Sequence, residues 1–344
     1  MLAISYLAMV STRAQVCSMT EGWANMLKNH IQIAPEPPMP VRVLCMVRSH
    51  VKNIEKQNAV WNTWGKHCDG FHVWTDKLAG NVPSRILNVP GGHDELILKT
   101  RAMLKEVWET EWNNAYDYFF CADDDTYTII PNLKHSIFKQ EQLHPNEPLY
   151  LGRRFVASGS GSMFNTGASG YVLNRKSLQL FITYMDQYQG SRHGSWDDVY
   201  VADVLALANV LPADSEANDG HTFIPISPES SYVYRIGSWG NNSWFDAYQV
   251  PLYGGEEQYN RKYPCCGVHC CSRYTASFHY VSAQNMFVIH NLIYACKKVV
   301  DQVSVGDQVQ LPPLVLSLPL MYLLYMIAHK SCRRQHSSLM CLKS

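Results

Sequence analysis

The chain has 344 residues, 47% of them hydrophobic and 17% charged, which is enough to bury one large core or two smaller ones. Lys and Arg together equal Asp and Glu at 29 each, so net charge gives no reason to expect a nucleic-acid partner or an anionic surface. Eleven cysteines exceed what a typical reduced cytosolic protein carries, and they favour an oxidising compartment.

Residues 1–40 are predicted to form an N-terminal segment or stem that precedes the fold. Residues 1–10 are apolar but too short to span a bilayer. The run 34–40, Ala-Pro-Glu-Pro-Pro-Met-Pro, is typical of a stiff extended linker. We therefore expect the folded domain to begin at Val41.

Strands and helices are predicted to alternate in the first half of this domain. The expected strands cover 41–47, 71–75 and 116–122, and the expected helices cover 53–64 and 94–112. Alternation of this kind predicts an α/β fold with a nucleotide-binding half.

The second half is expected to contain short strands and helices around a long irregular stretch, residues 215–275, rich in Tyr, Trp, Gly and Pro. We expect this stretch to form a loop-built face. The expected elements are strands at 148–152, 171–173 and 278–281, a helix capped by Asn174, a helix around 201–208 and a helix at 287–294.

Asp123, Asp124 and Asp125 follow the apolar run 116–122, which is predicted to be a strand buried on both faces. Three adjacent carboxylates repel one another and are costly to desolvate unless a cation joins them. Mg²⁺ and Mn²⁺ bind carboxylate and phosphate oxygens together, and open α/β folds bind ligands at the carboxyl ends of their strands. The triplet therefore predicts a metal-diphosphate site for a nucleotide-sugar, with an acidic surface turn as the alternative.

The C-terminal segment, residues 301–344, is predicted to be an atypical tail outside the fold. Its apolar stretch, 311–328, has no charged residue and is just long enough to span a membrane. Pro312, Pro313 and Pro319 make it a poor helix, because proline interrupts helical hydrogen bonding.

Six of the cysteines fall in two places. Cys45 and Cys68 bracket the first predicted strand-helix unit, and four more crowd a short loop that also contains His269. A metal clip is the alternative for that loop, but disulfides are the favoured interpretation. The four cysteines of that loop are Cys265, Cys266, Cys270 and Cys271.

A set of short motifs occurs in order along the chain: Ala122-Asp-Asp-Asp-Thr-Tyr127, Gly152-Arg-Arg-Phe155, Gly167-Ala-Ser-Gly-Tyr-Val-Leu173, Asp197-Asp-Val199, Cys270-Cys-Ser272 and Ser277-Phe-His-Tyr-Val281. In order and approximate spacing this set resembles the core 1 β1,3-galactosyltransferases (T-synthases) of glycosyltransferase family 31, over about residues 41–295.

The resemblance implies a GT-A type fold: a single Rossmann-like nucleotide-sugar domain over residues 41–300, with a loop-rich acceptor half. It also implies metal-dependent, inverting transfer of galactose from UDP-galactose to the 3-hydroxyl of O-linked GalNAc on Ser or Thr. The expected location is the Golgi membrane, as a single-pass type II protein with a lumenal catalytic domain. The expected partners are UDP-galactose and GalNAc-bearing glycoproteins. A homodimer is an open alternative, and no nucleic-acid partner is expected.

The resemblance also implies residue roles. Asp123, Asp125 and His279 would hold Mn²⁺, with a satisfied core histidine as the alternative for His279. Asp198 would be the catalytic base, while a plain interaction with a helix N-terminus is the alternative reading of Asp197 and Asp198.

Further roles follow from the same resemblance. The donor-binding candidates are Asp94, Lys99, Asp123 and Asp124. The acceptor-binding candidates are Asp197, Trp239, Trp244, Phe245 and Tyr248, with ordinary core packing as the alternative for the four aromatic residues. The disulfide candidates are Cys45, Cys68, Cys270 and Cys271.

The chain also departs from the family. It lacks the usual cysteines on either side of the acidic pair, has Ala202 in place of a glycine, and carries no recognisable signal-anchor. Two alternatives therefore stay open: another β1,3-glycosyltransferase of the family, such as a Fringe-like GlcNAc transferase, and a non-catalytic chaperone-like relative.

Overall fold

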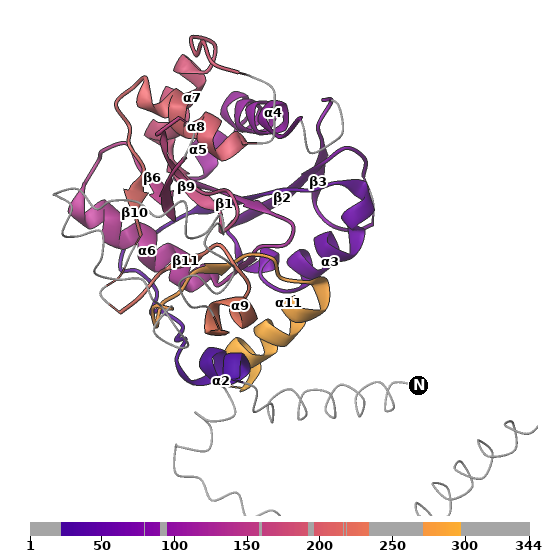
Figure 1. Cartoon of the computed structure of the whole chain (residues 1–344). Coiled ribbons are helices and arrows are strands. Elements are labelled where there is room, and N and C mark those ends of the chain that lie inside the picture. The colour runs from indigo at the N-terminus through magenta and orange to yellow at the C-terminus, as the bar shows by residue number, and fades with distance from the viewer. Residues whose placement is uncertain are drawn as a thin grey trace, which may run out of the picture. The chain divides into compact units, whose positions relative to one another are not determined.

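A seven-stranded sheet lies between layers of helices (Figure 1). The structure is a computed structural model that describes residues 22–78, 80–89, 95–157, 160–191, 196–215, 217, 219–233 and 271–296. The mixed sheet with a parallel centre confirms the predicted α/β fold of GT-A type.

The large sheet has the strand order β10-β6-β9-β4-β1-β2-β3. Its strands are β1 Val43–Arg48, β2 Gly70–Thr75, β3 Ser84–Ile86, β4 Tyr118–Asp123, β6 Tyr150–Gly152, β9 Tyr171–Asn174 and β10 Ala213–Asp214. Strands β4, β1, β2 and β3 are parallel, and β9 lies antiparallel between β4 and β6. All of β1 and the first five residues of β4 are buried, as expected for apolar strands covered on both faces.

The helices are α2 Gly22–Asn29, α3 Ile54–Asn62, α4 Leu96–Glu109, α5 Trp112–Ala115, α6 Ile130–Leu143, α7 Arg175–Tyr184, α8 Asp197–Ala206, α9 Pro228–Val233 and α11 Ala283–His290, with 3₁₀ turns at Val51–Asn53 and Gly65–His67 and a π-helical turn at Asn291–Ala295. Helices α4, α7 and α8 pack together on one side of the sheet, while α3, α11, α9 and α2 lie on the other (Figure 1). Connections through helices are what parallel strand pairs require.

Two small sheets complete the fold. Strand β12, Ser277–Phe278, lies between β11, Phe223–Ile224, and β5, Tyr127–Thr128, while β7, Arg154–Val156, pairs with β8, Met163–Asn165. The antiparallel pair β12–β5 places Phe278 opposite Tyr127. A C-terminal segment is thereby fixed beside the turn that follows the aspartate triplet.

The turn after the triplet is also tied to the core by Trp64. The indole is fully buried, its ring meets Phe71 and Phe120 edge to face, and its Nε1–H donates to the Thr126 carbonyl at 2.9 Å. Because a buried Trp N–H needs a partner, this hydrogen bond holds the turn against the layer that contains α3.

The N-terminal segment differs from the prediction of a stem. Helix α2 lies within it, and Ala24, Met26, Leu27 and Ile31 are buried in the main core. The Asn132 side chain on α6 bonds to the backbone of residues 32 and 34. The predicted start at Val41 is therefore too late, because burial of an apolar helix face adds these residues to the fold.

Other element predictions were confirmed or shifted. Asn174 caps α7 as predicted, since its side chain accepts a hydrogen bond from the Ser177 amide at 3.0 Å. Helix α4 begins later than predicted, at Leu96, with Glu95 at its N-cap. Helix α6 was not predicted from the sequence, although Leu133 and Ile137 bury one of its faces.

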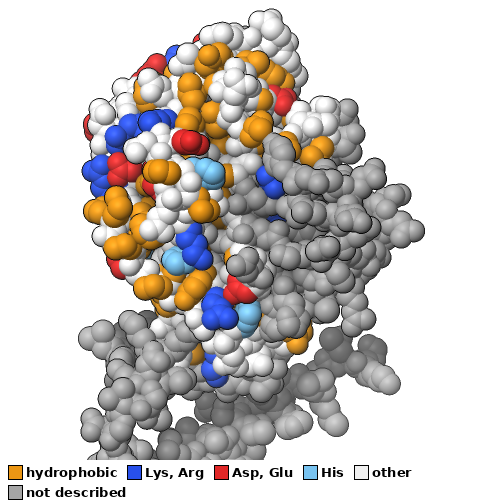
Figure 2. Space-filling model, turned by 90° about the vertical axis from the view of Figure 1, so that its left-hand side faces the viewer, with side chains coloured by type: hydrophobic (Ala, Val, Ile, Leu, Met, Phe, Trp, Pro, Cys, Tyr) orange, Lys and Arg blue, Asp and Glu red, His pale blue; other side chains and the backbone are white. Residues whose placement is uncertain are grey.

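The surface on the side of α6 and β10 mixes hydrophobic side chains with charges of both signs (Figure 2). Exposed apolar residues include Leu143 at the end of α6 and Leu211 ahead of β10. Mixing of this kind is ordinary, since apolar atoms form much of any protein surface. Across the described residues, no helix has the length and apolar character to cross a membrane.

A disulfide joins Cys45 on β1 to Cys68, just after the 3₁₀ turn that follows α3. Two of the four candidate cysteines are thus paired with each other. Cys271 is buried with its Sγ 3.5 Å from the Ser231 hydroxyl, while Cys270 lies outside the described residues. Cys296, which was not a candidate, is also disulfide-bonded.

We predict that replacing Cys45 and Cys68 by Ala lowers the free energy of unfolding by about 3 kcal/mol. The bridge closes a loop with a sequence separation of 23 residues, and releasing it restores entropy to the unfolded chain. Urea unfolding of the double variant and the wild type measures the difference. An unchanged midpoint would mean that the bridge adds nothing to stability.

Candidate active site

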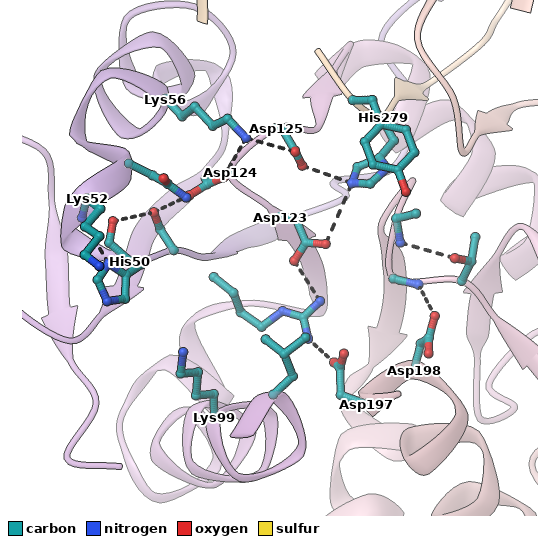
Figure 3. Close-up of a pocket in the computed structure, with 18 residues that line it drawn as sticks. His50, Lys52, Lys56, Lys99, Asp123, Asp124, Asp125, Asp197, Asp198 and His279 are labelled. Atoms are coloured by element: carbon teal, nitrogen blue, oxygen red, sulfur yellow. Dashed lines mark hydrogen bonds and ion pairs between the residues drawn. The ribbon is translucent and has the colours of Figure 1, made fainter. Parts of the chain in front are cut away.

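The candidate site lies where β1 and β4 end. Their parallel register pairs Arg48, the last residue of β1, with Asp123, the last residue of β4. A cavity of about 660 Å³ opens at this edge, lined from the turn after β1, α3, α4, the aspartate triplet, the loop 166–168, α8 and residues 279–280 (Figure 3). Open α/β sheets bind ligands at this edge.

Asp123, Asp125 and His279 bring one potential ligand atom each to within 4.8 Å of one another. His279 Nε2 lies 2.9 Å from Asp125 Oδ1 and 3.9 Å from Asp123 Oδ2 (Figure 3). Carboxylate oxygens and an imidazole nitrogen form a donor set that suits Mn²⁺. The structure therefore brings together the three residues predicted to hold a metal, and the set fits a divalent ion.

His279 reaches this position because the chain turns sharply after β12. Its backbone N–H donates to Ile224, and the Val281 N–H donates to the Asp125 carbonyl at 2.9 Å. Between them Tyr280 has φ 54°, a left-handed conformation that is uncommon for a bulky residue and costs about 1–3 kcal/mol. The turn ends the strand earlier than predicted and directs the imidazole towards Asp125.

Asp125 is held ionised by its neighbours. Although burial opposes ionisation, the His279 hydrogen bond and the Lys56 ammonium, whose Nζ is 3.0 Å from Oδ2, lower the pKa of Asp125 to about 2. A carboxylate that keeps its charge at any physiological pH is suited to bind a cation.

Asp124 points away from that cluster, towards the segment after β1. Its buried carboxylate accepts hydrogen bonds from the Ser49 hydroxyl and, at 2.9 Å, from the Asn53 amide. Burial raises the pKa of Asp124, while these two hydrogen bonds act against the rise. Asp124 therefore connects the start of α3 to the end of β4. It also lines the cavity in which the donor is predicted to bind.

Asp198 faces the same cavity from the first turn of α8. Its carboxylate accepts hydrogen bonds from the backbone N–H groups of Gly167 and Val199, both at 2.9 Å. Burial raises the pKa of Asp198, against the effect of these two hydrogen bonds. A carboxylate with a raised pKa is a stronger base than an ordinary aspartate, as a proton acceptor requires.

Asp197 is turned towards the protein. It is 4% exposed, forms an ion pair with Arg48, and accepts a hydrogen bond from the Thr100 hydroxyl at 2.7 Å. Asp197 also lines the cavity, so its role in acceptor binding stays a prediction.

Lys99, a predicted donor-binding residue on α4, also lines the cavity. Burial, and to a smaller extent the nearby Arg48 charge, lower the pKa of Lys99. A cation in this position suits a phosphate ligand.

Several cavity residues were not identified from the sequence. They are Arg48, His50, Lys52, Lys56 and Tyr280. Arg48, His50 and Lys52 lie at or just after the end of β1, and Lys56 lies on α3, so their closeness to the triplet depends on strand order. Tyr280 belongs to the motif Ser277-Phe-His-Tyr-Val281. Its side chain is exposed, and the centroid of its ring lies 4.0 Å from the centroid of the His279 ring.

Some predicted site residues lie outside the described part of the chain. They are Asp94, Trp239, Trp244, Phe245 and Tyr248.

The chain is similar to known glycosyltransferases. It is 30% identical over 279 residues to glycoprotein-N-acetylgalactosamine 3-beta-galactosyltransferase 1 of Xenopus laevis, a match that covers 76% of this chain and 69% of the frog protein. It is 28% identical over 134 residues to human chondroitin sulfate glucuronyltransferase, covering 38% of this chain and 17% of that protein. No protein-family model matches the chain.

Among solved structures, one match is a mannosyltransferase from Pyrobaculum calidifontis in complex with GDP-Man and Mn²⁺. It has a TM-score of 0.33 and 11% sequence identity, and the match covers 60% of this chain and 64% of that one.

We predict that Asp125→Asn and His279→Ala each weaken Mn²⁺ binding by at least about tenfold, because each removes a potential ligand. Asp124→Asn is the matched control from the same triplet, and a smaller loss is expected because its carboxylate faces Ser49 and Asn53. Calorimetric titration with Mn²⁺ gives the three affinities. Equal losses in all three variants would show that general negative charge binds the ion.

Proposed function

The chain belongs to the glycoprotein-N-acetylgalactosamine 3-beta-galactosyltransferase family, and from this membership we propose its full reaction. It transfers galactose from UDP-galactose to the 3-hydroxyl of GalNAc linked to Ser or Thr of glycoproteins. The reaction is metal-dependent and inverts the anomeric centre.

The observation that carries the proposal is the meeting of two groups in one cavity. Asp123, Asp125 and His279 form a potential metal-binding set, and Asp198 lines the same cavity with a raised pKa. Inverting transfer of a nucleotide-linked sugar needs these two functions side by side.

Asp123, Asp125 and His279 would hold Mn²⁺ in this proposal. A bound divalent ion would offset the negative charge that develops on the departing UDP. The cations Lys56 and Lys99 line the same cavity, so they add positive charge where the diphosphate would lie.

Asp198 acts as the general base. It takes the proton from the acceptor 3-hydroxyl as that oxygen bonds to the anomeric carbon from the face opposite the diphosphate. The bond from the anomeric carbon to the phosphate oxygen breaks, and UDP leaves with the bonding electrons. Hydrogen bonds from Gly167 and Val199 hold the carboxylate in place.

We further propose a lumenal site of action, in the Golgi, for a type II protein. The disulfide between Cys45 and Cys68 supports an oxidising compartment, because structural disulfides are rare in reduced cytosol.

We predict that the purified chain releases UDP from UDP-galactose when a GalNAc-Thr peptide and Mn²⁺ are supplied. EDTA should abolish turnover, and Asp198→Asn should lower kcat by at least about 100-fold, since general bases contribute 10²–10⁴. Coupled UDP detection and mass spectrometry of the peptide measure the two products. Turnover with UDP-GlcNAc in place of UDP-galactose would favour the Fringe-like alternative, and none with any UDP-sugar would overturn the proposal.

A second prediction concerns pH. Because Asp198 must be deprotonated to act, kcat/KM falls as pH drops through its pKa, and burial places this fall above the value near 3.9 of an ordinary aspartate. Rates at saturating Mn²⁺ across the acidic range measure it. A profile that stays flat down to about pH 4 would show that Asp198 titrates normally or is not the base.

A further inference from the structure

Arg48 is a buried cation between the two acidic groups of the cavity. Its side chain is 5% exposed, and it ends β1 directly beside the end of β4. One guanidinium nitrogen, Nη2, donates to Asp123 Oδ1 at 2.9 Å. The other, Nη1, donates to Asp197 and, at 2.9 Å, to the Thr100 hydroxyl.

These contacts divide the oxygens of Asp123 between two tasks. Oδ1 is engaged by Arg48, whereas Oδ2 faces His279 at 3.9 Å (Figure 3). A planar guanidinium can hold two acceptors in fixed directions, which the single ammonium of lysine does not. Arg48 therefore sets which carboxylate oxygen of Asp123 faces the metal-binding set.

Arg48 also borders the loop that holds Asp198. A Cβ added at Gly167 would lie 3.2 Å from Arg48 Nη2, so the guanidinium packs closely on this glycine. The Gly167 N–H is one of the two donors to Asp198. One side chain thus contacts β4, α4, α8 and the 166–168 loop.

The contacts of Arg48 matter because it is a cation among carboxylates. Asp123, Asp197 and Asp198 would repel one another in a partly dehydrated cavity wall if no cation lay between them. Loss of one partner of a buried ion pair leaves an uncompensated charge, which the structure relieves by moving. This repulsion would act between Asp123 at the end of β4 and the acidic pair in the first turn of α8, which Arg48 now joins.

We propose that Arg48 is a positioning residue that fixes the base, Asp198, relative to the metal-binding carboxylates. Both guanidinium Nη atoms donate to protein carboxylates, so we infer that Arg48 acts through Asp123 and Asp197. The role rests on the proposed function, because it supposes that both carboxylate groups serve one reaction.

The test compares Arg48→Met, which keeps length without charge, with Arg48→Lys and with Arg153→Met. Arg153 is an equally buried arginine, 4% exposed, that does not line the cavity. We expect Arg48→Met to lower kcat by about 30- to 100-fold, since small misplacements of reacting groups have effects of this size. The apparent affinity for UDP with Mn²⁺ should change by a smaller factor than kcat, and Arg48→Lys should lie between the wild type and Arg48→Met.

Asp197→Asn and the double variant Arg48→Met/Asp197→Asn complete a cycle. If Arg48 acts through Asp197, the double variant loses no more kcat than the stronger single variant, as coupled residues are non-additive. Additive losses would overturn this route of action.

Hydrogen exchange decides the positioning role without turnover. The amides of Gly167 and Val199 donate to Asp198. Their exchange rates should be at least about tenfold higher in Arg48→Met than in the wild type, and unchanged in Arg153→Met. Unchanged exchange in Arg48→Met, or equally faster exchange in Arg153→Met, would overturn the proposal. If the wild type transfers no galactose, the proposed function fails, while the exchange result still decides whether Arg48 positions Asp198.

Discussion

The parallel register of β1 and β4 is the constraint on which the site depends. It places Arg48 and Asp123 side by side at the carboxyl edge of the sheet. Side chains alternate between faces along a strand, so a slip of one residue would turn Asp123 to the opposite face. Both strands are buried apolar runs up to these charged ends, so a slip would draw Arg48 or Asp123 into the apolar core, which is costly. Packing of the core therefore determines the electrostatics of the cavity.

Crowding of carboxylates is resolved by giving each one a different partner. In the triplet, Asp123 pairs with Arg48, Asp124 bonds to the segment that follows β1, and Asp125 lies between Lys56 and His279. Their environments push the pKa of Asp124 up and the pKa of Asp125 down. Three identical residues in succession thus acquire different chemical properties, which the sequence alone does not distinguish.

The sequence predicted the alternating elements and the placement of the triplet, because apolar runs and strand ends are local features. His279 was assigned only through the family resemblance, since its approach to Asp125 depends on the pairing of β12 with β5 and on the turn at Tyr280. Arg48 was not identified, because nothing local shows that β1 lies next to β4. Helix α6 was missed although its signals are local: Pro131 lies in its first turn, as is common at helix starts, and Leu133 and Ile137 mark its buried face.

The charge balance of the cavity explains why a metal and a diphosphate belong together in it. Five carboxylates line it, from Asp123, Asp124, Asp125, Asp197 and Asp198, against four Lys and Arg side chains, which leaves one net negative charge with histidines neutral. A diphosphate alone would add negative charge to a cavity that is already negative. A divalent ion alone would reverse the sign of a partly dehydrated wall. Bound together they largely cancel, so the pair perturbs the existing ion pairs least. Arg48 is one of the four cations in this balance, and its removal would make the cavity more negative at the point where the two acidic groups meet.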